Sequence, residues 1–235
     1  MADGPGNRLL ATLSSDDCRW LEPYLERVDL PRGTVLAEEG EVLSHTYFPH
    51  TAVVSLVRPL KDGRVVEMAT FGREGLVGLA FAGILLQSFG RYIVQMPGAA
   101  SRIGTTRLQM AASACPGIQD MMLRYTEMLM ALTLQSVACN AVHGVEARAC
   151  RWISATRDRA GRDDIPLTHE FLAEMLGVQR STVSDVLRTL QGRGLIHQAR
   201  GKITVNDGSR LQQAACECYH ILRGKYQQLL PVAER

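Results

Sequence analysis

A helix predicted over about residues 180–190 has two faces with different chemistry. Its polar side chains recur at spacings of three and four and consist of Arg180, Ser181, Ser184, Asp185 and Arg188. Its apolar side chains are Val183, Val186 and Leu187. An arginine guanidinium can donate two hydrogen bonds to a guanine edge, and a carboxylate can accept one from cytosine. The polar face could therefore contact base edges while the apolar face holds the helix on its domain.

The residues before this helix predict a first helix and a tight turn. Thr168 can cap the first helix, Leu172 and Leu176 point inward, and Ala173 is small where a second helix must cross. Gly177 can end the first helix in the left-handed conformation. An ordinary helical hairpin is the alternative. The combined spacing favours a helix-turn-helix, whose second helix enters the major groove of DNA.

Two short β segments follow, at 194–198 and 202–205, and predict a wing that touches phosphate. Arg200 and Lys202 place positive charge at or beside its tip, and Thr168 and Thr182 are further expected phosphate contacts. The whole predicted set of DNA contacts is Thr168, Gln179, Arg180, Ser181, Thr182, Ser184, Asp185, Arg188, Arg200 and Lys202.

Composition agrees with a basic C-terminal domain in a globular chain. The 235 residues are 46% hydrophobic and 21% charged. Residues 151–235 carry 13 Lys and Arg against 9 Asp and Glu, whereas residues 1–110 carry 11 against 12. Cations near phosphates release condensed counterions, so this asymmetry favours a nucleic-acid partner. No apolar leader is expected at residues 1–8, and the apolar run at 76–86 is shorter than the ~20 residues a membrane helix needs.

The six cysteines are scattered, which favours structural thiols in a reducing cytoplasm over a disulfide framework. Cys216 and Cys218 lie in a segment predicted as helix, where residues two apart point to different faces. We therefore expect no metal site and no cofactor.

A long helix is predicted from Pro116 to about His143, with apolar residues recurring by sevens. The two series are Ile118, Tyr125, Leu132 and Cys139, and Met121, Met128, Gln135 and Val142. We expect these eight residues, the predicted seam, to join two copies of the chain. Packing of the helix on its own domain is the alternative.

Residues 34–103 predict short antiparallel strands that form a roll or a barrel. Strands at 52–58 and 64–70 flank an Asp-Gly turn, Asp62-Gly63, which favours a hairpin. Before the roll, Ser14 can cap a small helix with Asp17 three residues on.

This order of elements resembles the Crp/Fnr transcription regulators. The motifs that carry the resemblance are 172–177, 179–184 and 190–196, with a looser match at 71–78. The resemblance implies an α+β chain: a jelly-roll-like β-roll sensor domain (1–113), a dimerisation helix (114–146) and a winged helix-turn-helix (147–235). It also implies a homodimer on an inverted-repeat operator in promoter DNA, with RNA polymerase and a small-molecule effector as further partners, and no enzymatic activity.

By the same resemblance, Arg180 takes the position that grips a guanine edge. Ser181 stands where many members have glutamate, and Asp185 where many have arginine, so a different half-site is expected. In the sensor domain, Leu79 stands where a glutamate binds a cyclic nucleotide, and Phe89 falls where an arginine pair begins. The candidate effector pocket comprises Gly78, Leu79, Phe89 and Arg91, and a filled apolar core is the alternative. A cyclic-nucleotide-responsive regulator remains the second interpretation.

Other chemistries fit the sequence less well. An iron–sulfur sensor needs an N-terminal cysteine cluster, but only Cys18 lies there. Haem would need one axial ligand, such as His45, His50 or a cysteine. A cupin-like metalloenzyme would need closely spaced histidines and a carboxylate, and His45 and His50 lack the His-x-His pattern. A helix-turn-helix protein that binds only another protein is the remaining alternative.

Overall fold

The computed structural model describes residues 6–61, 63, 65–78 and 87–230. Contacts divide the chain into two compact units. The first comprises residues 1–58, 68–130 and 225–235, and the second comprises 59–67 and 131–224. The long helix is thus divided between the units at residues 130 and 131. The predicted domain limits at 113 and 146 stay a prediction.

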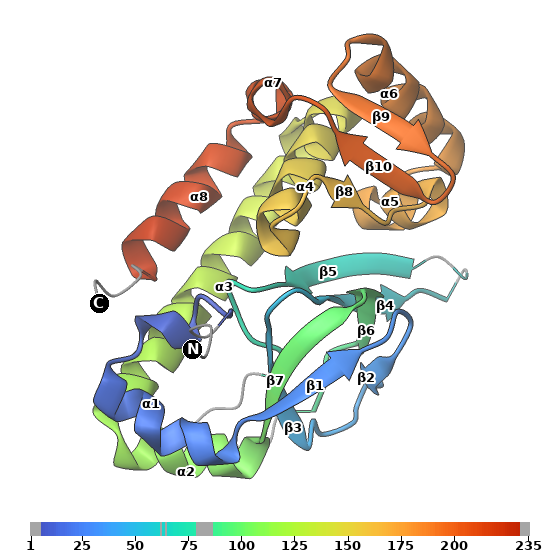
Figure 1. Ribbon diagram of the computed structural model, residues 1–235. Coiled ribbons are helices and arrows are strands. Elements are labelled where there is room, and N and C mark those ends of the chain that lie inside the picture. Colours follow the sequence, from blue (N-terminus) through green and yellow to red (C-terminus); the bar gives the residue numbers. More distant parts are fainter. Residues whose placement is uncertain (1–5, 62, 64, 79–86, 231–235) are drawn as a thin grey trace. The chain divides into compact units, whose positions relative to one another are not determined.

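Two antiparallel sheets form the N-terminal roll (Figure 1), which confirms the predicted α+β class. A three-stranded sheet has the order β1-β7-β3, and a four-stranded sheet has the order β2-β6-β4-β5. The strands are β1 (Glu26–Leu30), β2 (Val35–Ala37), β3 (His45–Pro49), β4 (Val53–Pro59), β5 (Val65–Phe71), β6 (Arg91–Met96) and β7 (Gly98–Gly104). The predicted hairpin is β4 and β5, and Gly63 in its turn has a φ of +85°.

Short helices precede and follow these strands: η1 (Leu10–Thr12), α1 (Ser15–Leu21), η2 (Glu22–Tyr24) and α2 (Thr105–Ala114). Ser14 caps α1 by accepting a hydrogen bond from the backbone N–H of Asp17 at 3.1 Å, as predicted.

Helix α3 (Pro116–Val142) begins in the core of the first unit. Ile118, Met121 and Tyr125 are buried there with residues such as Leu76, whose carbonyl accepts a hydrogen bond from the Tyr125 hydroxyl at 3.2 Å. In the second unit, Cys139 is buried with other cysteines. Six of the eight residues of the predicted seam are less than 9% exposed, namely Ile118, Met121, Tyr125, Met128, Leu132 and Cys139. A side chain already covered by its own chain has little area left for a partner, so this burial argues against the register, and the predicted seam stays a prediction.

A different face of α3 is exposed and apolar. It follows the same alternation of four and three residues and consists of Leu123, Glu127, Met130, Leu134, Val137 and Ala141, hereafter the α3 stripe. Leu134 and Val137 are 64% and 65% exposed. The heptad spacing predicted from the sequence is therefore present twice, and the stripe lies on the face that solvent reaches.

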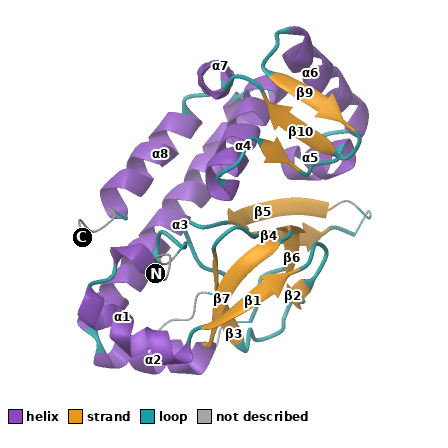
Figure 2. Ribbon diagram, in the orientation of Figure 1, coloured by secondary structure: helices purple, strands orange, loops and turns teal. Residues whose placement is uncertain are grey.

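The second unit holds the remaining elements (Figure 2). They are α4 (Val145–Ala160), β8 (Asp164–Ile165), α5 (His169–Leu176), α6 (Arg180–Gly192), β9 (Ile196–Ala199), β10 (Lys202–Val205), α7 (Gly208–Ala214) and α8 (Cys218–Leu229), whose last residues fall in the first unit. Strands β8, β10 and β9 form one antiparallel sheet. Within the described part of the chain, no helix is long and apolar enough to span a bilayer.

The turn between α7 and α8 differs from the prediction. Cys216 lies outside both helices, and Cys218 is the first residue of α8, so these cysteines do not share a helix. Helical geometry therefore does not force their side chains to point in different directions.

Candidate nucleic-acid interface

Helices α5 and α6 form the predicted helix-turn-helix. The Thr168 hydroxyl accepts a hydrogen bond from the backbone N–H of Phe171 at 3.2 Å and so caps α5. Gly177 ends α5 with a φ of +65°, a conformation that costs a residue with a Cβ atom. Leu172, Ala173 and Leu176 are buried, as predicted. The local sequence therefore sets both ends of the first helix.

Helix α6 has the two faces expected from the sequence. Val183, Leu187 and Leu190 are fully buried, and Val186, predicted as buried, is half-buried. On the opposite side Arg180, Ser181, Asp185 and Arg188 are exposed, while Ser184 is half-buried. The apolar side fixes α6 to the domain and leaves the polar side to face a groove.

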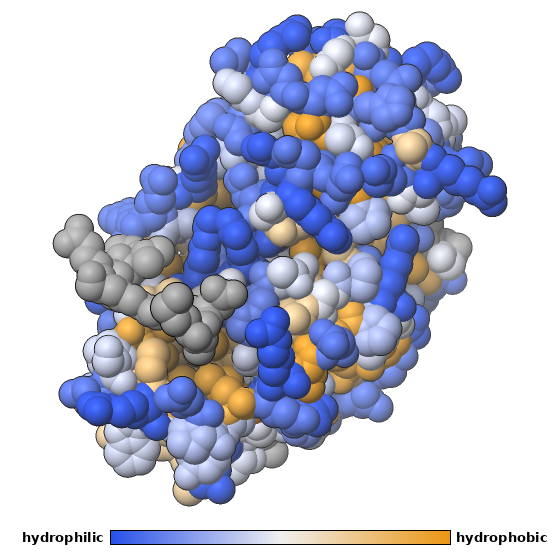
Figure 3. Space-filling model, in the orientation of Figure 1, coloured by the Kyte–Doolittle hydropathy of each residue, from blue (hydrophilic) through white to orange (hydrophobic). Residues whose placement is uncertain are grey.

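The other predicted contacts surround α6. Gln179 is exposed at the N-cap position, although its side chain makes no cap hydrogen bond, and Thr182 is half-buried. Arg200 is exposed in the turn between β9 and β10, where Gly201 has a φ of +70°. The wing is thus present, with β8 as a third strand that the sequence analysis did not include. Figure 3 shows mostly hydrophilic residues on the visible face around these elements, as a module in contact with water or nucleic acid requires.

His169 joins the recognition helix to the wing and was missed by sequence analysis. Its Nδ1 lies 2.9 Å from Ser184 Oγ on α6, and its Nε2 lies 3.1 Å from Gln198 Oε1 on β9. The backbone N–H of Gln198 also donates to Gln191 Oε1 at 2.7 Å. A single histidine after a cap carries no sequence signal for this role, because both partners are distant along the chain.

Exposed ion pairs hold several of the predicted contact residues. Arg180 Nε lies 2.7 Å from Glu170 Oε1, and Arg188 lies 2.9 Å from Asp185. Lys202 Nζ lies 3.2 Å from Asp164. Surface pairs of this kind contribute at most about 1 kcal/mol, so phosphates and bases can displace the carboxylates.

Asp164 anchors the base of the wing. A hydrogen bond from the Thr204 hydroxyl at 2.7 Å, together with the Lys202 pair, lowers the pKa of Asp164. The carboxylate therefore stays ionised at neutral pH and orients the Lys202 side chain.

The four candidate effector residues do not all lie within the described structure. Leu79 lies outside the described residues, as does most of the apolar run at 76–86. Gly78 has a φ of +84°. Phe89 is 76% exposed, and Arg91 forms an ion pair with Glu38 at 2.8 Å. An arginine held by a carboxylate must exchange that partner before it can bind a phosphate.

The histidines considered for haem or a cupin-like site have other partners. His45 Nδ1 lies 2.9 Å from Ser44 Oγ, and His50 Nε2 lies 2.8 Å from Ser101 Oγ. Burial, together with the Arg27 charge, lowers the pKa of His50. Within the described ranges, neither histidine belongs to a group of three potential metal ligands. Neither site hypothesis gains support from this arrangement.

The turn of the helix-turn-helix supplies a stability prediction. Gly177→Ala should lower the free energy of unfolding by about 1–2 kcal/mol, because a Cβ atom strains the left-handed backbone although it meets nothing within 4 Å. Gly192→Ala is the matched control. This glycine ends α6 without a positive φ and also has open space, so alanine should stabilise by about 0.5 kcal/mol. Calorimetric melting of the full-length variants measures both, and equal shifts of the same sign would contradict the backbone argument.

Comparison with known proteins agrees with this geometry. Residues 147–214 match the family model of the Crp-like helix-turn-helix domain. The "CRP-like cAMP-activated global transcriptional regulator" of Mycobacterium tuberculosis is 23% identical over 214 residues, which cover 83% of this chain and 90% of that protein.

Solved structures show the same fold. FixK2 from Bradyrhizobium japonicum superposes with a TM-score of 0.69 at 16% identity and covers 82% of this chain and 98% of its own. A Crp/Fnr-family regulator from Eubacterium rectale has a TM-score of 0.65 at 15% identity, with 88% and 96% coverage. An antiparallel roll followed by a winged helix-turn-helix defines a class of DNA-binding regulators. The resemblance drawn from the sequence is confirmed: residues 147–214 are a Crp-like helix-turn-helix domain, and the chain as a whole is similar in sequence to a CRP-like regulator and shares the fold of Crp/Fnr regulators.

Proposed function

We propose that the protein is a homodimer that binds an inverted-repeat operator and regulates transcription at promoters. The observation that carries this proposal is the two-sided recognition helix α6. Its buried side locks it to the domain, and its exposed side presents hydrogen-bonding groups beside a basic wing. A twofold dimer would read two half-sites about one DNA turn, roughly 34 Å, apart.

Base reading is assigned to α6 and backbone contact to its surroundings. Arg180 is proposed to contact a guanine, and Ser181, Ser184, Asp185 and Arg188 to contact neighbouring base edges or the backbone. Thr168, Thr182, Arg200 and Lys202 are proposed to contact phosphates, and Gln179 completes the set at the start of α6. His169 is added as a positioning residue, since it bonds both α6 and the wing.

Dimerisation is proposed through the α3 stripe in place of the predicted seam. Five of its six residues are apolar, and all six are exposed on one helix face at heptad spacing. Two such stripes packed together would remove the apolar side chains from water, and each Å² of apolar surface buried stabilises the dimer by about 25 cal/mol. Glu127 is the polar member, and a single polar residue in such a seam restricts the register at a cost in stability.

The effector is proposed to differ from a cyclic nucleotide. The mycobacterial relative is described as cAMP-activated. By the family resemblance, Leu79 and Phe89 stand in this chain where a cyclic-nucleotide site has polar residues. Arg91, which lies nearby in the sequence, is paired with Glu38. Calorimetry with cyclic AMP and cyclic GMP should show no binding tighter than about 1 mM, near −4 kcal/mol. Micromolar binding of either nucleotide would support the second interpretation, a cyclic-nucleotide-responsive regulator.

Mobility-shift and footprinting experiments on native promoter fragments test the proposed function. The regulator should shift specific fragments at nanomolar concentration and protect two related half-sites. In the cell, we propose that it acts in the cytoplasm, where RNA polymerase works. A cupin-like metalloenzyme or a helix-turn-helix protein that binds only proteins would shift none of them. Retardation of every fragment with equal affinity would contradict the operator hypothesis.

A further inference from the structure

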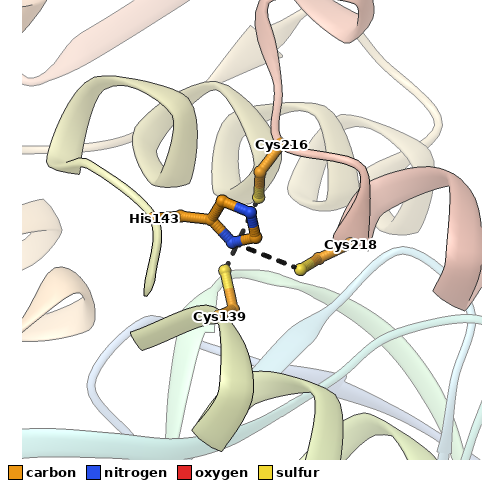
Figure 4. Close-up of side chains that lie close together, drawn as sticks. All are labelled: Cys139, His143, Cys216 and Cys218. Atoms are coloured by element: carbon orange, nitrogen blue, oxygen red, sulfur yellow. Dashed lines mark hydrogen bonds between the residues drawn. The ribbon is translucent and has the colours of Figure 1, made fainter. Parts of the chain in front are cut away.

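Four potential metal ligands meet in the second unit, and none of them is among the proposed DNA contacts (Figure 4). They are Cys139, His143, Cys216 and Cys218, and their ligand atoms all lie within 4.8 Å of one another. Cys139 Sγ lies 3.5 Å from Cys216 Sγ, and Cys218 Sγ lies 3.6 Å from His143 Nδ1. A tetrahedral zinc ion with ligand bonds of about 2.0–2.3 Å separates its ligand atoms by roughly 3.3–3.8 Å. Small side-chain adjustments would therefore complete the tetrahedron.

The backbone explains why these groups converge. Cys139 and His143 are four residues apart, and the hydrogen bond from His143 N to Cys139 O at 3.0 Å continues the α-helical turn, so both side chains share one face. Cys216 is held by a hydrogen bond from its N–H to the carbonyl of Ala147 at 3.3 Å, and Cys218 begins α8. Because Cys216 precedes the helix, its thiol can turn to the same side as that of Cys218 (Figure 4). This is the convergence that the helical prediction excluded.

The surrounding residues have the arrangement of a second coordination shell. His143 directs Nδ1 at the thiols, while its Nε2 lies 3.0 Å from a carboxylate oxygen of Glu217. A carboxylate on the far nitrogen fixes the tautomer and ring orientation of a zinc-bound histidine. The side-chain amide of Gln135 donates a hydrogen bond to Cys218 Sγ at 3.0 Å, which would stabilise a thiolate. Both contacts are unneeded if the cysteines only fill space.

We propose that Cys139, His143, Cys216 and Cys218 bind one Zn²⁺ ion in a closed tetrahedral site. The four protein ligands would fill all four coordination positions of a tetrahedral zinc ion, and the three cysteines are at most 5% exposed. A closed, buried site of this kind is typical of structural zinc. The ion links the end of α3 to the turn between α7 and α8, and so ties the helix that carries the α3 stripe to the segment that follows the wing. Thiolate and imidazole ligands suit zinc among the divalent ions.

A disulfide between Cys139 and Cys216 is the competing chemistry. It would require the two sulfurs to approach from 3.5 Å to about 2.05 Å and would use only two of the four residues. The orientation of His143 by Glu217 and the contact of Gln135 with Cys218 have no part in such a bond. The tetrahedral site uses all of them.

Metal analysis of the full-length protein, purified under reducing conditions without a polyhistidine tag, tests the proposal. We expect one zinc per chain by mass spectrometry. After zinc removal, one equivalent of Co²⁺ should produce the visible bands of a tetrahedral site and thiolate-to-cobalt charge transfer. Cys139→Ser, Cys216→Ser and Cys218→Ser should each abolish stoichiometric binding, whereas Cys150→Ala, a buried cysteine of α4 outside the cluster, should retain it.

Three further variants separate a lost ligand from a lost fold. His143→Cys should keep one metal per chain with a Cys₄ cobalt spectrum, while His143→Ala should not. Glu217→Gln should weaken zinc affinity about 10–100-fold at unchanged helix content, because the histidine loses the negative charge of its orienting carboxylate. A reduced wild-type protein that binds neither Zn²⁺ nor Co²⁺ stoichiometrically would overturn the proposal. So would a Cys139–Cys216 disulfide in a metal-free protein, or iron with acid-labile sulfide as the native occupant.

Discussion

Arg180→Ala is expected to weaken operator binding by about 1–3 kcal/mol at each half-site, the usual contribution of one bidentate guanine contact. The two losses should roughly add in a dimer, to about 2–6 kcal/mol, because the half-sites are far apart. Folding should be unchanged, since Arg180 is exposed and Val183 and Leu187 hold α6 on its domain. Among the described residues, the substitution removes the exposed ion pair of Arg180 with Glu170.

The decisive feature of this result is its selectivity for sequence. Affinity for operator and for scrambled DNA is measured at several salt concentrations, and Arg180→Ala should affect mainly the operator. Lys202→Ala, at a proposed phosphate contact, should weaken both DNAs and reduce the salt slope by about one. Arg193→Ala is the charge-matched control, because Arg193 is an exposed arginine of the same unit that pairs with Glu146 and lies outside the proposed contacts. Equal weakening of both DNAs by Arg180→Ala would make Arg180 a phosphate anchor and contradict the assigned recognition register.

Leu134→Asp is expected to convert a dimer into a folded monomer. Leu134 is 64% exposed in the single chain, so an aspartate there is solvated in the monomer but faces a like charge in the α3 stripe of the partner copy. Burying such an unpaired charge costs about 3–5 kcal/mol, which weakens association more than 100-fold. Size-exclusion chromatography with light scattering at micromolar concentration measures the change, and circular dichroism measures the fold.

Leu132→Asp is the contrasting variant, two residues away on the same helix. Leu132 is 7% exposed, so its replacement should lower the melting temperature of the chain itself. A Leu134→Asp variant that stays dimeric, or a wild type that is monomeric at micromolar concentration, would remove the α3 stripe as the interface. If Leu132→Asp dissociated the dimer without changing the melting temperature, the result would support the predicted seam as the interface.

Local signals in the sequence were sufficient for elements whose geometry depends on neighbouring residues. The cap at Ser14, the turn glycine at Gly63, and the cap and stop of α5 at Thr168 and Gly177 were all predicted and are present. The polar and apolar faces of α6 were also predicted, because helical periodicity alone sorts side chains around an axis. These signals determined the helix-turn-helix, the wing and the antiparallel roll, and with them the class of protein.

Helical periodicity did not determine which face of α3 is free. The predicted seam and the α3 stripe both have heptad spacing, and both are largely apolar. Packing in the first unit buries Ile118, Met121 and Tyr125 of the seam, and the α3 stripe stays exposed to solvent. The choice depends on residues such as Leu76, whose contact with Tyr125 no local pattern contains.

The sequence by itself determined that this chain carries a Crp-like DNA-binding module, because caps, turns and amphipathic spacing are properties of short segments. Only the tertiary structure decided the exposed face of α3, the bridge that His169 makes between α6 and the wing, and the convergence of Cys139 with Cys216. Each of these joins residues that lie far apart along the chain or depends on packing around a whole helix. Their proximity is set by how the elements pack, and a single sequence does not record such contacts.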